Sequence, residues 1–468
     1  MKKDGSGSAF IIIAGAILLL FIMSFVPWSN ISGNKLKDYG LFSDLSLNTI
    51  KVTANEMIDP ELEAALAEIN EAEENEPEEI MPVTPDQEIL VDEPIKEYVT
   101  SANISPQGIV LFEDYTENHS GLTNLKRAIL NSSSRPARIA VIGDSYIEGD
   151  ILTMNLRELL QNKYTGCGVG YLAAYTDIPG FRTSVRQESS GWTRHEIRTD
   201  APTDMRIIQG EYYTSGEGAK IKYKGVNRLQ HLDSWQHTTV VFVAPNGGAL
   251  TVTADKGEQT YDVEPSSHVQ AVEMDDETTS VKINVSPGID LLGVYLDGTN
   301  GIAVDNMSMR GNSGQTHRLL SVDRAQELRK YIDYDLIILE YGINALSSQQ
   351  TDYSGYGKVM ERVVTTLKRC YPNADILMLS TGDRGQKSGT EIKSLPTVNA
   401  MVAAQREAAR QCKILFWDMR EAMGGENSIV DWRNEGLVNP DYIHINAKGG
   451  KKLASLLFDA LENCLNCD

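Results

Sequence analysis

Short apolar runs alternate with helical patterns in two separate parts of the chain. The run 138–142 (RIAVI) is followed by a helical pattern over residues 152–163 (LTMNLRELLQNK), and the same alternation fills residues 322–464. Such alternation indicates βαβ units around a buried parallel sheet, and therefore an α/β fold. In the second part we expect helices at 322–332, 356–370, 396–411 and 447–464 and strands at 335–340, 375–379 and 414–417.

The stretch 181–303 differs, because its apolar and polar residues alternate with a period of two. Its expected half-buried strands, separated by Gly, Asn, Asp and Ser clusters, are 206–213, 238–243, 249–253 and 281–285. We therefore predict a β-sandwich (jelly-roll-like) domain at 181–303, inserted between two parts of the α/β domain at 104–180 and 304–468.

The N-terminal region carries an uncharged apolar segment. Residues 9–26 are 18 apolar or small residues, about the length that crosses a bilayer as a helix. Two lysines precede the segment, so the positive-inside bias places residues 1–8 in the cytoplasm and the following chain outside. The alternative is a cleaved signal peptide, but its apolar stretch is typically shorter, and residues 27–30 offer no A-x-A-like site. We predict an uncleaved signal anchor at 9–28.

An acidic stretch separates this segment from the globular part. Residues 55–98 hold sixteen Asp or Glu, one lysine and five prolines, so they cannot bury enough apolar surface to offset the entropy of ordering. We expect a mostly disordered stalk at 29–103, with an acidic interaction tail as the alternative. The formal net charge of the chain is −22. Such a chain gains nothing from counterion release, so we expect no nucleic-acid partner.

A serine directly follows the first expected strand. Gly143, Asp144 and Ser145 stand at its carboxyl end, where open parallel sheets bind ligands. A serine hydroxyl becomes nucleophilic when an imidazole takes its proton and a carboxylate orients that imidazole. One loop before the last helix offers both groups, Asp441 and His444. Taken alone, the tripeptide is also typical of turns, and the histidine of a helix cap or surface position.

Two further motifs offer donors for an oxyanion. Asn344 follows the expected strand 335–340, and the run 311–314 (GNSG) precedes the expected helix 322–332. A side-chain amide and a glycine N–H are the donors that an oxyanion hole requires. Separately, Asn344 could cap a helix and either glycine could merely turn the chain. Together, the order Ser, Gly, Asn, Asp/His indicates a hydrolase site.

In this order the motifs resemble those of the SGNH/GDSL hydrolase superfamily, over about residues 105–465. The resemblance implies a flavodoxin-like α/β/α sandwich with a five-stranded parallel sheet. The site residues that it implies are Ser145, Asp441 and His444 as the catalytic triad, and Ser145, Gly314 (in a second register Gly311) and Asn344 as the oxyanion hole.

Three runs resemble the peptidoglycan O-acetylesterase branch of that superfamily: 143–161 (GDSYIEGDILTMNLRELLQ), 166–170 (GCGVG) and 294–314. Members of the branch carry a carbohydrate-binding-module-like β insertion, which agrees with the period-two stretch. The chain departs from the family pattern at Ala345, where many members have Asp, and at Tyr146, where the branch often has His. These departures leave the identity of the ester open.

Other side chains carry weaker signals. We expect no metal and no cofactor, because six histidines show no metal-ligand spacing: His119, His195, His231, His237, His268 and His317. Cys464 and Cys467 could form a disulfide, half a zinc site or a fortuitous pair. Trp192 with Tyr212 or Tyr213 could stack on sugar rings, but core packing is the other reading.

These observations predict a membrane-anchored, extracytoplasmic serine esterase. Its expected reaction removes O-acyl groups, with O-acetyl as the first candidate, from a cell-envelope polysaccharide such as peptidoglycan. Its expected partners are that polysaccharide and the inner membrane, and its expected compartment in a Gram-negative cell is the periplasm. One alternative is an O-acyltransferase that works on envelope glycans with a membrane-bound acyl-transferring partner. A third interpretation is a non-catalytic glycan-binding envelope protein.

Overall fold

The computed structural model describes residues 103–178 and 180–466. The predicted signal anchor at 9–28 and the predicted stalk up to residue 102 lie outside these ranges, as does Cys467. None of the helices within them combines the length and the hydropathy that a membrane crossing requires. The described residues all belong to one compact unit of the chain.

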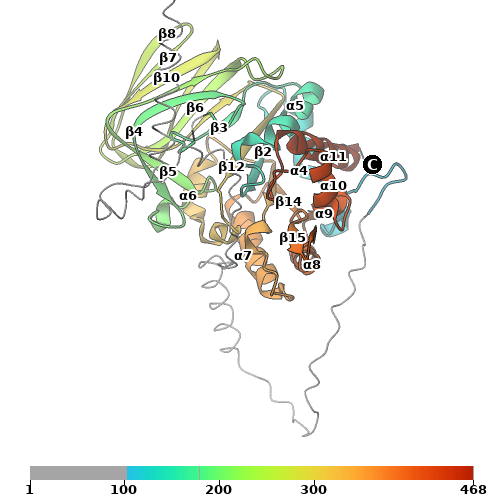
Figure 1. The fold of residues 1–468 in the computed structure, drawn as a ribbon. Coiled ribbons are helices and arrows are strands. Elements are labelled where there is room, and N and C mark those ends of the chain that lie inside the picture. Colours follow the sequence, from blue (N-terminus) through green and yellow to red (C-terminus); the bar gives the residue numbers. More distant parts are fainter. Residues whose placement is uncertain (1–102, 179, 467–468) are drawn as a thin grey trace, which may run out of the picture. The chain divides into compact units, whose positions relative to one another are not determined.

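Five parallel strands form the centre of the α/β part (Figure 1). Every residue of the neighbouring strands β2 (Ala137–Gly143) and β13 (Leu336–Glu340) is buried, which agrees with their nearly continuous apolar sequences. A two-residue strand, β1 (Glu113–Asp114), extends the sheet antiparallel to β17. Numbered along the chain, the parallel strands lie in the order 2-1-3-4-5, so the expected flavodoxin-like sheet is confirmed. In spatial order they are β12 (Ile302–Ser308), β2 (Ala137–Gly143), β13 (Leu336–Glu340), β14 (Asp375–Leu379) and β17 (Leu415–Trp417).

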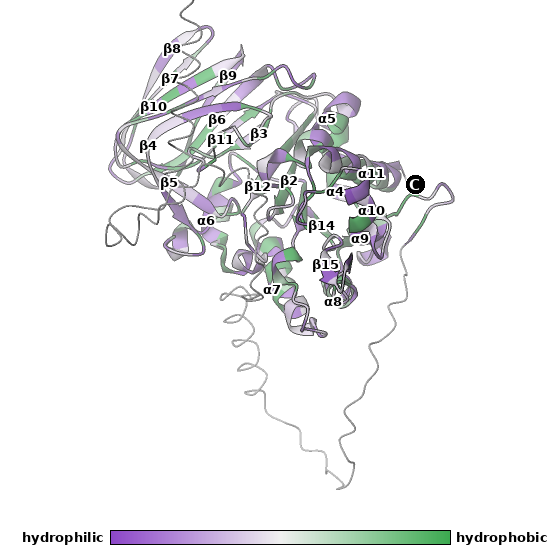
Figure 2. Cartoon of the chain, in the orientation of Figure 1, coloured by the Kyte–Doolittle hydropathy of each residue, from purple (hydrophilic) through white to green (hydrophobic). Residues whose placement is uncertain are grey.

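Helices cover both faces of this sheet. The connection from β2 to β12 crosses the sheet in one direction, and the connections from β13 to β14 and from β14 to β17 cross it in the other. Because such connections are right-handed, the helices of the two groups lie on opposite faces of the sheet. Helix α5 packs against α11, and α7 packs against α8. Figure 2 shows apolar and polar residues alternating along α7, as expected for a helix with one buried face. The helices are α4 (Thr123–Leu130), α5 (Thr153–Tyr164), α6 (Val322–Leu328), α7 (Ser354–Cys370), α8 (Val398–Gln411), α9 (Met419–Met423), α10 (Ser428–Asn434) and α11 (Ala447–Asn466).

A second, antiparallel sheet comes from the middle of the chain, drawn in green to yellow in Figure 1. Seven strands follow in the order β8-β7-β10-β5-β11-β6-β9, while β3 pairs with β11 and β4 pairs with β5. Its strands are β3 (Gly170–Leu172), β4 (Arg186–Glu196), β5 (Glu211–Lys224), β6 (Trp235–Ala244), β7 (Gly248–Ala254), β8 (Gly257–Val263), β9 (Ser266–Thr278), β10 (Ser280–Val285) and β11 (Asp290–Asp297).

The antiparallel sheet differs in two places from the sequence prediction. It already begins with β3 at Gly170, ahead of the expected boundary at 181. The strand expected at 206–213 lies at 211–224 instead, because the two-residue alternation continues past two glycines that look like a turn in the sequence. All of these strands belong to the same compact unit as the α/β part. A separate inserted β-sandwich domain therefore stays a prediction.

The central antiparallel strands are buried on both faces. Along β6, Val240 and Phe242 pack in a core formed within the antiparallel strands, whereas Val241 and Val243 join the core that also contains the parallel sheet. Leu292 and other residues of β11 follow the same alternation. One continuous core thus extends from the parallel sheet to the nearer face of the antiparallel sheet.

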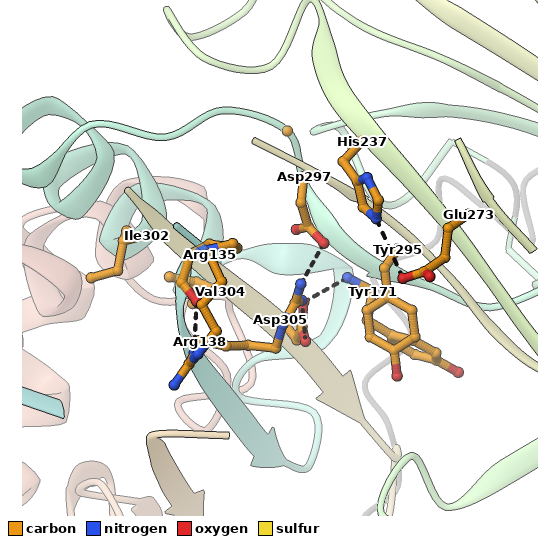
Figure 3. Close-up of polar contacts among 12 residues, drawn as sticks. Arg135, Arg138, Tyr171, His237, Glu273, Tyr295, Asp297, Ile302, Val304 and Asp305 are labelled. Atoms are coloured by element: carbon orange, nitrogen blue, oxygen red, sulfur yellow. Dashed lines mark hydrogen bonds and ion pairs between the residues drawn. The ribbon is translucent and has the colours of Figure 1, made fainter. Parts of the chain in front are cut away.

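Buried charges join the two sheets (Figure 3). Arg138 of β2 donates hydrogen bonds to Asp297 at the end of β11 (2.6 Å) and to Asp305 of β12 (3.1 Å), and all three side chains are at most 8% exposed. Asp305 also accepts the N–H of Tyr171 (2.8 Å) and the hydroxyl of Tyr334 (3.1 Å). Asp297 Oδ1 has no hydrogen-bond partner within the described ranges. Arg138 is therefore the main neutralising group for Asp297.

Candidate active site

The structure brings Ser145 and His444 together. Ser145 lies just beyond the carboxyl end of β2, half-buried, and its Oγ is 2.9 Å from His444 Nε2. Gly143 ends β2 as a glycine for a steric reason, because a Cβ there would lie 2.8 Å from Glu340 Oε2 at the end of β13. The close approach of β2 and β13 thus sets where the serine emerges from the sheet.

Asp441 fixes the orientation of His444. Its Oδ2 is 2.8 Å from His444 Nδ1, and its Oδ1 accepts the backbone N–H groups of Ile443 and His444, both at 3.0 Å. Burial alone would raise the pKa of Asp441, but these hydrogen bonds lower that pKa below its usual value. An ionised carboxylate only accepts hydrogen bonds, so Nδ1 carries a proton and Nε2 offers its lone pair to Ser145.

The loop that carries Asp441 and His444 is held from both ends. The Asn439 N–H donates to the His444 carbonyl (2.8 Å), and the Gly385 N–H, from the hairpin of β15 (Gly385–Ser388) and β16 (Glu391–Ser394), donates to the Tyr442 carbonyl (2.8 Å). The side chains of His444 and Asp441 remain 37% and 31% exposed. Water can therefore reach the imidazole.

Asn344 lies beside the serine loop, as expected for neighbouring strands at a topological switch point. Its Nδ2 donates to Asp144 Oδ2 (2.9 Å) and to the Asn312 carbonyl (3.1 Å). Both amide hydrogens are therefore already used. Stabilising an oxyanion would require the amide to exchange or share one of these bonds.

The two glycines of the 311–314 run differ in the state of their N–H groups. The Gly314 N–H donates to Asn312 Oδ1 (2.7 Å) inside the protein, so it is already used in this structure. For the N–H groups of Gly311 and Ser145, no acceptor is found in the part of the chain that the structure describes. To serve as an oxyanion donor, Gly314 would have to exchange its bond to Asn312, just as Asn344 would have to exchange one of its bonds, so the role of Gly314 stays a prediction. Gly311, the second register of the sequence analysis, fits better.

A buried carboxyl pair beneath the site was not foreseen. Asp144 and Glu340 are at most 1% exposed, and the Asp144 N–H is 3.4 Å from Glu340 Oε2. Burial raises the pKa of Asp144 to about 7, and burial together with the neighbouring Asp144 charge raises the pKa of Glu340 well above its usual value. Two such carboxyls do not both ionise easily, so the pair retains a proton near neutral pH. A glutamate ending an otherwise apolar strand was the available sequence signal.

Other candidate residues lie away from the triad. Tyr212 and Tyr213 are at most 5% exposed and pack in the protein interior, and the Trp192 indole donates to the Lys220 carbonyl (3.1 Å). The two tyrosines are therefore not available for stacking on a sugar ring. Across the described ranges, no group of three or more His, Cys, Asp or Glu side chains could hold a metal ion.

Comparison of the sequence with known families matches residues 284–452 to the GDSL-like lipase/acylhydrolase family. The match includes Gly311, Asn344, Asp441 and His444, and the fold adds Ser145 from the preceding part of the chain. Residues 284–452 thus form part of a GDSL-like hydrolase domain. Its chemistry is therefore that of an esterase or acylhydrolase.

Solved structures share the fold of this hydrolase. A peptidoglycan O-acetylesterase structure aligns with 76% of this chain and 99% of its own, at 23% identity and a TM-score of 0.63. A family two carbohydrate esterase from Cellvibrio japonicus aligns with 60% of this chain and 98% of its own, at 13% identity and a TM-score of 0.25, which is too weak a likeness to argue from. Comparison with curated proteins finds no match.

Proposed function

We propose that this SGNH/GDSL hydrolase removes O-acetyl groups from a cell-envelope polysaccharide, with peptidoglycan as the first candidate. The observation that carries the proposal is the Ser145–His444–Asp441 relay, with links of 2.9 and 2.8 Å, at the switch point of the parallel sheet. The choice of polysaccharide is supported by the shared fold with a peptidoglycan O-acetylesterase and by the sequence resemblance to that branch. The apolar segment 9–26 supports a membrane-anchored, extracytoplasmic enzyme.

The triad geometry defines the steps. Ser145 Oγ attacks the acetyl carbonyl carbon while its proton passes to His444 Nε2, and Asp441 stabilises the imidazolium. The tetrahedral oxyanion lies toward the N–H groups of Ser145 and Gly311 and the Asn344 amide. When the intermediate collapses, the bond to the sugar oxygen breaks and His444 returns the proton to that oxygen. Water then attacks the acetyl-serine in the same way and releases acetic acid.

Release of acetate by the full chain and by a Ser145→Ala variant tests the proposal. We expect the parent to release acetate from O-acetylated peptidoglycan and from a small aryl acetate, and Ser145→Ala to lose both activities. Ser134→Ala is the matched control. Ser134 is an exposed serine just before the amino-terminal end of β2, whereas Ser145 follows the carboxyl end of the same strand. Undiminished activity of Ser145→Ala would contradict the assignment.

The same assay separates hydrolysis from acyl transfer. The partly exposed His444 favours water as the acceptor, so free acetate should be the product even when an unmodified glycan is present. Acetylated glycan in place of acetate would identify an O-acyltransferase. Glycan binding without either product, and without labelling of Ser145 by a fluorophosphonate, would identify a non-catalytic binding protein.

A further inference from the structure

A pocket of about 400 Å³ lies between the antiparallel sheet and the loops of the active site. On the catalytic side its walls include Glu148, shortly after Ser145, and Arg310, next to Gly311, and these two side chains form an ion pair at 2.7 Å. Arg198 lines the pocket from the side of the antiparallel sheet, close to Gly311. If Gly311 carried a Cβ, that atom would lie 4.0 Å from Arg198 Nη1. The pocket therefore borders the proposed oxyanion loop without containing the triad.

Three polar atoms of the pocket walls are buried and have no hydrogen-bond partner in the described part of the chain. They are the Tyr171 hydroxyl, Arg198 Nε and Gln209 Oε1. Tyr171 and Gln209 are only 4% and 2% exposed. Buried polar atoms are almost always satisfied, so their gathering in the walls of one pocket leaves both donor and acceptor capacity unused beside it.

Apolar side chains at the mouth of the pocket are exposed. Tyr175, Ile178 and Phe181 are 38–42% exposed and are among the few large hydrophobic residues of the described chain to be so. Phe181 packs against Gly149, where a Cβ would lie 2.6 Å from its ring and where φ is +65°. An exposed aromatic side chain beside unsatisfied polar groups offers an apolar face and a polar end to a ligand.

The charges of the pocket walls balance. The lining holds four arginines and four acidic side chains. Burial raises the pKa of one of these acids, Glu211, to about 7, while Arg182 is paired with Asp150 behind the wall (3.4 Å). Arg194 is paired with Asp177 (2.7 Å) and Glu196 (2.9 Å), and Arg198 is paired with Glu196 (3.2 Å). An excess of positive charge, as a phosphate or a uronic acid would require, is therefore absent among these lining residues. The pocket suits an uncharged ligand.

We propose that this pocket binds a neutral, hydroxyl- and amide-bearing sugar ring of the glycan whose ester is cleaved at Ser145. The inference rests on the proposed function for the identity of the glycan, but the binding site itself does not. Sugar hydroxyls and N-acetyl groups supply both the donor that Gln209 Oε1 requires and the acceptor that Arg198 Nε requires, while Tyr175 and Phe181 contact the apolar face of the ring. Binding here positions a neighbouring ester beside the triad.

Direct binding to an inactive chain tests the pocket apart from catalysis. The probe is tri-N-acetylchitotriose, titrated calorimetrically into the detergent-solubilised full chain that carries Ser145→Ala. We expect saturable binding, and the added changes Tyr175→Ala and Phe181→Ala to weaken it about tenfold. Leu130→Ala, which removes a 79% exposed side chain from α4, is the control and should have no effect. No saturable binding, or equal affinity with and without the two aromatic side chains, would overturn the proposal.

Kinetics on the chain with an intact Ser145 give a second readout. In the Tyr175→Ala, Phe181→Ala variant, KM for O-acetylated peptidoglycan should rise, while kcat/KM for a small aryl acetate should stay unchanged because that ester does not need the pocket. An equal loss on both esters would contradict a binding role. If chitotriose binds but no acetate is released from any ester, the proposed function fails and the pocket assignment stands.

Discussion

Replacing Arg138 with methionine would remove the cation between two buried carboxylates. Asp305 would keep the Tyr171 N–H and the Tyr334 hydroxyl as partners, whereas the Asp297 carboxylate would lose its main neutralising group. Breaking a buried ion pair by removing one partner costs about 3–5 kcal/mol of unfolding free energy. We expect a loss in that range, arising chiefly from Asp297.

Urea unfolding followed by tryptophan fluorescence measures this loss. Adding Asp297→Asn to Arg138→Met should recover more stability than adding Asp305→Asn, because the amide removes the charge that has no other partner. Burial already raises the pKa of Asp297, and without Arg138 that pKa should rise further.

The sign of the pH dependence follows from that shift. A carboxyl whose pKa is higher in the folded than in the unfolded chain stabilises the fold while it is protonated, and this contribution is lost as the pH rises above the unfolded value of about 3.9. The loss of unfolding free energy caused by Arg138→Met should therefore be larger at pH 8 than at pH 5. A loss of unfolding free energy below about 1 kcal/mol at pH 8 would refute the reasoning. Equal recovery of stability by Asp297→Asn and Asp305→Asn would also refute it.

Three further predictions concern the active site. Asp441→Asn should lower kcat about 10⁴-fold without a change in thermal stability, since the amide can stabilise the wrong imidazole tautomer; a loss of less than tenfold would exclude the orienting role. Asn344→Ala should lower kcat on an aryl acetate about 10²–10³-fold, and unchanged kcat would remove Asn344 from the oxyanion hole. Gly314→Ala should lower the melting temperature more than Gly311→Ala, because a Cβ on Gly314 would lie 2.6 Å from the Tyr341 ring whereas one on Gly311 meets only Arg198 at 4.0 Å; the reverse order in a thermal unfolding scan would contradict this packing argument.

The elements of the parallel sheet could be predicted closely from the sequence. The strand 375–379 was placed at the observed residues, and the helix expected at 447–464 begins at the predicted residue. Fully buried strands and long amphipathic helices leave strong local patterns, which do not depend on distant partners. The pairing of Ser145 with His444 was expected from triad chemistry and the family resemblance, because His444 lies in the loop before α11 and not at the end of a parallel strand.

Features that depend on side-chain orientation or on distant contacts could not be predicted. Whether Gly311 or Gly314 has a free N–H is decided by the Asn312 side chain, whose orientation no local pattern reveals. The raised pKa values of Asp144 and Glu340 arise only when β2 and β13 pair. Strand β3 was missed because three residues in a glycine-rich run carry too little periodicity, and only the pairing with β11 defines it.

The position of β3 has a consequence for solubility. Strand β12 is the last strand of the parallel sheet, and an open edge of this kind is a template for pairing with another molecule. Strand β3 covers that edge: a Cβ on Gly170 would lie 2.7 Å from the Val304 carbonyl, and the Tyr171 N–H is bound by Asp305. The antiparallel sheet therefore also shields the hydrolase from edge-to-edge self-association, and shortening it would expose an aggregation-prone strand.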